Sequence, residues 1–188
     1  MKNELPRVIA TTILGITRDG KAALGGDGQV TFNDTIVKHG STKIRRLHEE
    51  TVLTGFAGAA ADALTLFERF EEKLDTHKGN LRKAVVELAK DWRTDRYLRR
   101  LEALLICLDT EHSFVVSGTG DIIEPDDGIV TIGAGGGYAL AASRAYLEAD
   151  PEIELRDVVE KSLMIASRIC PYTNDQISLM TLPDKESK

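Results

Sequence analysis

The hydrophobic pattern of this chain changes period repeatedly, and the order of those changes restricts the fold more than any other feature. Short apolar runs bounded by turn residues indicate strands, while apolar residues three or four positions apart indicate amphipathic helices. In the first such helix the apolar stripe contains Leu64, Phe67, Phe70 and Leu74. The pattern predicts strands at 12–17, 21–24, 51–56, 103–108, 113–117, 122–123, 129–132 and 176–182, and helices covering 64–74, 81–92, 139–149 and 155–169.

Strands and helices therefore come in separate groups rather than in alternation. Grouped elements favour an α+β fold built of layers, not an alternating parallel sheet. The chain has 188 residues, the size of one domain, and no linker, repeat or low-complexity segment divides it. We expect a single domain at 11–188, preceded by a leader at 1–10.

The charge and the apolar runs exclude several classes of protein. A net charge of −6 argues against a general nucleic-acid-binding surface, which needs a basic excess. No apolar run approaches the eighteen or so residues of a membrane span, and the leader is too short and too polar for a signal peptide. Two cysteines, Cys107 and Cys170, lie in apolar segments and are expected to be buried free thiols of a reducing compartment. We expect a cytoplasmic protein.

A pair of threonines, Thr11 and Thr12, follows the leader. If the chain is cut after Ala10, Thr11 carries a free α-amine, whose pKa is roughly 7.7–8.0 in a model chain. One residue then supplies both a nucleophile and the base that activates it, as in N-terminal threonine catalysis. The alternative is that this β-branched pair only opens a strand. In the catalytic interpretation Thr12 is expected to contribute far less than Thr11.

Longer motifs surround this pair. They read TTILGITRDGKAALGGDGQVTF at 11–32, KIRRL at 43–47 and TGFAG at 54–58, followed by ADALTLF at 61–67, VELAKDWRTDR at 86–96, LEALL at 101–105 and ICPYTN at 169–174. In this order they resemble the HslV (ClpQ) family, the bacterial relatives of proteasome β-subunits, over nearly the whole chain from Thr11. The resemblance implies a threonine endopeptidase with the four-layer αββα sandwich of N-terminal nucleophile hydrolases.

The resemblance also assigns supporting catalytic residues. Taken alone, Asp27 within Gly26-Asp27-Gly28 reads as a turn residue. In the family this aspartate supports the nucleophile through a lysine, which falls at Lys43; sequence spacing alone does not choose Lys43 over Lys38. A cation there disfavours the protonated amine and stabilises the developing alkoxide. The oxyanion donor is expected at Gly55 or its neighbour, although strand–helix packing also explains that glycine.

A glycine-rich run at 133–137 departs from the family. It lacks the ending of a P-loop, so it does not predict nucleotide binding. The family usually has a serine where this chain has Ala134, and alanine removes a hydrogen-bonding hydroxyl from the catalytic network. Ala134 therefore supports an alternative, an impaired or inactive subunit that serves as a structural ring component. A small-molecule amidase is a third, weaker alternative.

The resemblance implies a cofactor and partners as well. Ser167, Cys170 and Thr173 match a loop that binds a monovalent cation, usually sodium, through backbone carbonyls, with Ser167 standing where the family has glycine. The family assembles into two stacked hexameric rings with its active sites inside. A hexameric HslU-type ATPase docks on the ends and feeds in unfolded polypeptides.

Overall fold

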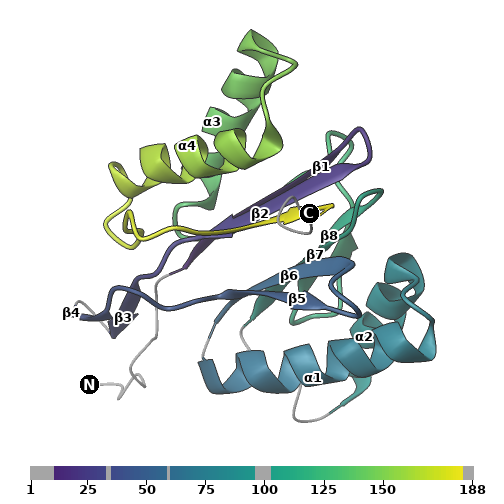
Figure 1. Ribbon diagram of the computed structural model, residues 1–188. Coiled ribbons are helices and arrows are strands. Elements are labelled where there is room, and N and C mark those ends of the chain that lie inside the picture. The colour runs from purple at the N-terminus through teal and green to yellow at the C-terminus, as the bar shows by residue number, and fades with distance from the viewer. Residues whose placement is uncertain (1–10, 33–34, 59, 96–102, 184–188) are drawn as a thin grey trace.

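The computed structural model describes residues 11–32, 35–58, 60–95 and 103–183. Two antiparallel sheets stack face to face, and each is covered on its outer side by a pair of helices (Figure 1). This confirms the α+β class and the four-layer αββα sandwich. The helices are α1 (Ala60–Thr76), α2 (Leu81–Thr94), α3 (Gly136–Ala149) and α4 (Leu155–Ser167).

Eleven strands make up the described sheets. The first sheet has the order β10-β1-β2-β11 and the second the order β5-β6-β7-β8-β9, while β3 and β4 form a separate hairpin. The strands are β1 (Thr12–Arg18), β2 (Lys21–Gly26), β3 (Val30–Phe32), β4 (Thr35–Lys38), β5 (Ile44–Leu47), β6 (Val52–Ala57), β7 (Leu104–Leu108), β8 (Ser113–Ser117), β9 (Ile122–Ile123), β10 (Ile129–Gly133) and β11 (Ser178–Leu182).

Strand β1 is buried because both of its faces are covered. Ile13 belongs to the cluster between the two sheets, whereas Leu14 and Ile16 belong to the cluster under α3 and α4. Successive side chains of a strand point to opposite faces, so one short strand contributes to two cores. A third cluster, with Phe70 and Trp92, fills the layer between α1, α2 and the second sheet.

Local signals place the ends of these elements. The β1–β2 turn has Asp19 at φ 52° and Gly20 at φ 71°, the left-handed pair that a tight hairpin requires. The Asn80 side chain accepts a hydrogen bond from Lys83 N at 3.0 Å and caps α2, as the sequence predicts. The left-handed Gly79 lies between α1 and α2 (φ 77°).

Three strands, β3, β4 and β5, were not predicted from the hydrophobic pattern. β4 is exposed along its whole length, and β5 carries two arginines between its buried ends, so neither shows the alternation of a half-buried strand. β5 forms because it pairs with β6 at the edge of the second sheet. Helix α3 begins three residues earlier than predicted, inside the glycine run, and α4 ends two residues earlier.

Two further predictions concern membrane spans and thiols. Among the described residues, no helix has the length and apolarity needed to cross a membrane. Cys107 and Cys170 are both free and buried, as expected. Burial raises the pKa of the Cys107 thiol far above its usual range, so this thiol stays protonated.

Candidate active site

The carboxylate of Asp27, in the loop that follows β2, organises the site. It is fully buried and accepts hydrogen bonds on both oxygens. Its Oδ1 accepts from Thr12 N at 2.7 Å and from Lys43 Nζ at 2.9 Å, and its Oδ2 accepts from Gln29 N at 3.0 Å and Asn174 N at 3.3 Å. These four donors offset the cost of burying the carboxylate away from water.

Lys43 immediately precedes β5 and points back to the Asp27 loop. Its Nζ donates to Asp27 Oδ1 and, at 2.6 Å, to the backbone carbonyl of Gln29. Burial lowers the pKa of Lys43, and the negative charge and hydrogen bond of Asp27 partly oppose that decrease. Lys38, the other candidate, lies on the exposed strand β4. The structure therefore brings Lys43 to Asp27.

Thr11 lies directly before β1 and is 7% exposed. Its carbonyl oxygen accepts a hydrogen bond from Ala134 N at 2.9 Å. Gly133 pairs with Thr12 across β1 and β10, has φ +89°, and would overlap the Thr11 carbonyl if it carried a Cβ. Position 133 therefore requires a glycine, because any side chain there would collide with the Thr11 carbonyl.

Thr12 has a structural role that the sequence analysis did not predict. Its side chain is fully buried, its Oγ1 lies 2.6 Å from Thr173 Oγ1, and it accepts a hydrogen bond from Gly135 N at 2.9 Å. A Cβ at Gly135 would lie 2.6 Å from both hydroxyl oxygens. Thr12 thus joins β1 to the start of α3 and to the α4–β11 loop. The only sequence signal was its place beside Thr11.

Two amide side chains near Asp27 were also missed. The Gln29 Nε2 donates to the Pro171 carbonyl at 2.9 Å. The Asn174 side chain accepts from Gly28 N at 3.0 Å and donates to the His39 carbonyl at 2.8 Å. Both residues stand in recognisable motifs, but only the tertiary structure brings the two motifs together.

Gly55 lies inside β6, in register with Ile44 of β5 and Ile106 of β7. A Cβ there would be 3.0 Å from two carbons of the Ile13 side chain, so close packing of the two sheets accounts for this glycine. The amide of its neighbour Phe56 donates to the Lys43 carbonyl at 3.2 Å. The oxyanion role of Gly55 stays a prediction.

Ala134 is exposed and stands between the end of β10 and the start of α3. Its amide holds the Thr11 carbonyl, so its backbone takes part in the site whatever its side chain is. Residue 134 is exposed, so a serine at this position would have room for its hydroxyl.

The three predicted cation ligands lie at the end of α4 and on the turn that follows it. Ser167 is the last residue of α4, and the Cys170 and Thr173 residues are each 4% exposed. Pro171 has no N–H, so the carbonyl of Ser167 cannot receive the helical bond from four residues ahead. Among the described residues, no cluster of three or more His, Cys, Asp or Glu side chains could hold a metal ion.

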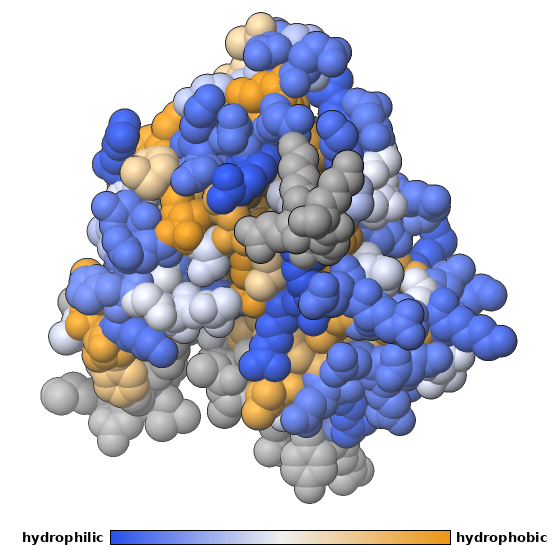
Figure 2. All heavy atoms as spheres, in the orientation of Figure 1, coloured by the Kyte–Doolittle hydropathy of each residue, from blue (hydrophilic) through white to orange (hydrophobic). Residues whose placement is uncertain are grey.

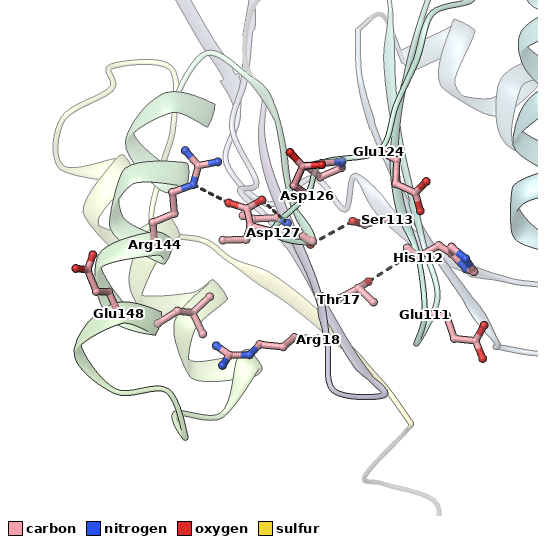
Figure 3. A pocket seen from close by; sticks show the side chains of 14 residues that line it. Thr17, Arg18, Glu111, His112, Ser113, Glu124, Asp126, Asp127, Arg144 and Glu148 are labelled. Carbon is pink, nitrogen blue, oxygen red and sulfur yellow. Dashed lines mark hydrogen bonds and ion pairs between the residues drawn. The ribbon is translucent and has the colours of Figure 1, made fainter.

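A surface pocket of about 750 Å³ lies away from these residues. Figure 3 shows it between the tip of the β1–β2 hairpin, the β7–β8 turn, the β9–β10 loop and α3, with Thr17, Arg18, Asp127 and Arg144 on its walls. Arg144 Nε donates to Asp127 Oδ2 at 2.8 Å across it. Thr17 and Thr12 are near opposite ends of β1, so this polar pocket does not contain the predicted nucleophile.

Known proteins are similar to this chain over most of its length. A family model described as "Proteasome subunit" matches residues 8–182. The chain is 56% identical over 174 residues to an ATP-dependent protease subunit HslV of Chlorobium phaeobacteroides (strain BS1), covering 93% of this chain and 95% of that protein. It is 58% identical to the HslV subunit of Aquifex aeolicus (strain VF5), covering 90% of this chain and 96% of that one.

A solved structure is similar to this chain in fold as well as in sequence. The crystal structure of eukaryotic HslV from Trypanosoma brucei superposes with a TM-score of 0.85 at 40% identity, covering 90% of this chain and 98% of that chain. The chain therefore belongs to the proteasome family and, within it, to the HslV subunits, which are threonine peptidases.

Proposed function

We propose that this chain is the catalytic subunit of an ATP-dependent protease, in which Thr11 becomes the nucleophile once residues 1–10 are removed. The observation that carries the proposal is the shared oxygen of Asp27, which binds Lys43 Nζ and the amide that links Thr11 to Thr12. A buried cation beside the first residue of β1 is the arrangement that an N-terminal threonine nucleophile needs.

The reaction proceeds in two transfers. The Thr11 hydroxyl attacks the scissile carbonyl while its proton passes to the α-amine of the same residue, and the positive charge of Lys43 stabilises the developing negative charge. The ammonium then protonates the leaving amine, which departs as the C–N bond breaks and leaves an ester on Thr11. Water, deprotonated by the same amine, hydrolyses that ester and restores the hydroxyl.

The oxyanion of the tetrahedral intermediate requires a backbone donor, and Gly55 of β6 is the proposed position. Gly55 packs against the side chains of Ile13 and Ile44, and these two residues directly follow Thr12 and Lys43 in the chain. This closeness to the residues of the site supports the proposal.

Sodium is the proposed cofactor, held by the backbone carbonyls of Ser167, Cys170 and Thr173. The residues fit, since the Ser167 carbonyl has no helical donor and carbonyl oxygens suit hard monovalent cations. The Cys170 carbonyl accepts one hydrogen bond, from Thr173 N at 3.2 Å, and keeps a second lone pair. When bound, the ion would supply a fixed positive charge that orders this turn beside Thr12.

The proposed assembly is a double ring of six subunits each, with an HslU-type hexameric ATPase that delivers unfolded polypeptides. Relatives of this chain are named as subunits of an ATP-dependent protease. Apolar side chains are exposed on the β3–β4 hairpin, with Phe32 and Ile36 each 45% and Val37 60% exposed (Figure 2). Such a group is typical of a surface that another subunit covers. The free, buried cysteines are consistent with the proposal that this protein functions in the reducing cytoplasm.

One experiment tests the central claim. The intact mass of the purified protein is expected to correspond to a chain that begins at Thr11, and that protein is expected to hydrolyse unfolded substrates when the ATPase and ATP are added. Thr11→Ala should abolish hydrolysis while ring mass stays unchanged, because only the nucleophile is lost. Full activity in chains that all retain Met1 would contradict the proposal, and wild-type turnover by Thr11→Ala would contradict the nucleophile.

A further inference from the structure

The side chain of Gln29 connects two loops that are far apart in the sequence. Gln29 is 3% exposed, and its Nε2 donates to the Pro171 carbonyl at 2.9 Å and to Thr31 Oγ1 at 3.0 Å. Pro171 lies on the turn between α4 and β11, and Thr31 belongs to β3. Both donor hydrogens of this buried amide are therefore used, and one of them crosses to the other loop.

The main chain of the same residue holds both members of the ion pair. Gln29 N donates to Asp27 Oδ2 at 3.0 Å, and the Gln29 carbonyl accepts from Lys43 Nζ at 2.6 Å. A shift of the Gln29 backbone would consequently move the ammonium of Lys43 and the carboxylate of Asp27 together. The side-chain bond to Pro171 limits such a shift.

We propose that Gln29 is a positioning residue for Lys43, acting through its side-chain bond to the Pro171 carbonyl. The inference rests on the proposed threonine peptidase function. The side chain of Gln29 contacts no reacting atom; it sets the backbone to which Lys43 is hydrogen-bonded. A displacement of a catalytic group by about 1 Å can reduce a rate by as much as about a hundredfold, so this one contact is expected to be visible in turnover.

Asn174 ties the same two loops together at other points and does not replace this contact. Its side chain binds Gly28 N and the His39 carbonyl, and its backbone amide reaches Asp27 Oδ2. None of these three bonds involves the Gln29 carbonyl that holds Lys43. We expect the loops to stay together without the Gln29 amide, with the position of Lys43 relaxed.

The test replaces the amide by a carboxyl group of the same shape. Gln29→Glu removes both N–H donors and places a carboxylate oxygen against the carbonyl oxygen of Pro171, where the two oxygens repel each other. In the assembled, leader-free protease, kcat for a fluorogenic peptide is expected to fall about ten- to a hundredfold while KM changes less than about twofold. Burial raises the pKa of the introduced carboxyl group, and its protonated form regains an O–H donor for the Pro171 carbonyl. The ratio of variant to wild-type kcat should therefore rise as the pH is lowered.

Gln176→Glu is the matched control, because Gln176 is exposed and its Nε2 binds the side chain of the neighbouring Asp175 at 3.3 Å. It should keep wild-type kcat and a flat pH ratio. Gln29→Met, which has no donor but packs as a neutral side chain, should show the kcat loss without recovery at low pH.

Several outcomes would overturn the inference. They are an unchanged kcat in either Gln29 variant, a loss confined to KM, or a flat pH ratio for Gln29→Glu in correctly assembled rings. If Gln29→Glu does not assemble, the kcat of Gln29→Met tests the inference instead. A reduced kcat in that variant supports it, and an unchanged kcat overturns it. An inactive wild type would instead contradict the proposed function, so the two failures are distinguishable.

Discussion

Lys43 and Thr12 donate hydrogen bonds to the same carboxylate oxygen, Oδ1 of Asp27, at 2.9 and 2.7 Å. That oxygen couples the position of a buried cation to the backbone of the first strand. Thr11 is joined to Thr12 by one peptide bond. A substitution at Asp27 or Lys43 is therefore expected to shift the backbone position of Thr11, the predicted nucleophile.

Lys43→Ala is expected to reduce turnover about a hundredfold or more, the usual scale for removing a positioned electrostatic or acid–base group. Lys38→Ala is the control, because Lys38 lies on exposed β4, and it should cost little. Steady-state peptide hydrolysis by assembled rings measures both variants. The reverse ranking would show that the wrong lysine had been assigned.

The titration of Lys43 gives a prediction that does not depend on activity. Burial lowers the pKa of Lys43 below 10.5, and Asp27 raises it partway back through its charge and hydrogen bond. Asp27→Asn removes the opposing charge, so the pKa of Lys43 should fall further in that variant. NMR titration of lysine labelled at Cε would detect both shifts. A Lys43 pKa that rises in Asp27→Asn would mean that Asp27 does not stabilise the ammonium.

Thr12→Ala tests the buried hydroxyl that the sequence did not single out. The substitution leaves Gly135 N and the Thr173 hydroxyl without their shared partner, and an unsatisfied buried polar group costs about 1–3 kcal/mol. Thr12→Ser keeps the oxygen and should lose clearly less stability. Denaturant unfolding at fixed protein concentration measures the difference, and equal losses in the two variants would rule out the hydroxyl as the cause.

Ala134→Ser tests the departure from the family. The alanine side chain is exposed, so an added hydroxyl has room, and a serine hydroxyl can donate and accept hydrogen bonds beside Thr11. We expect turnover to rise by about tenfold, which corresponds to roughly 1.4 kcal/mol of barrier. Single-turnover acylation measures the effect directly. No change would remove the main support for an impaired structural subunit, because the hydroxyl would then be dispensable.

Much of the fold follows from the order of the residues. Alternating and helical periods predicted both helix pairs and most strands, since burial of one face repeats at short sequence distance. The left-handed turn at Asp19-Gly20 and the Asn80 cap depend only on neighbouring residues. Strands β3, β4 and β5 were not predicted, because they form by pairing with neighbouring strands and their own sequences lack an alternation of apolar and polar residues.

The candidate site divides in the same way. Thr11, Asp27 and Lys43 could be proposed from motifs, although only the family resemblance preferred Lys43 over Lys38. The tertiary structure alone decided which groups meet at Asp27, because Gln29 and Asn174 come together across 145 positions of sequence, as Asn174 N and Gln29 N bind the same Oδ2. Sequence determines which side chains can donate or accept a proton. Long-range packing of β1, β2 and the α4–β11 loop determines the distances between them, and those distances decide the chemistry.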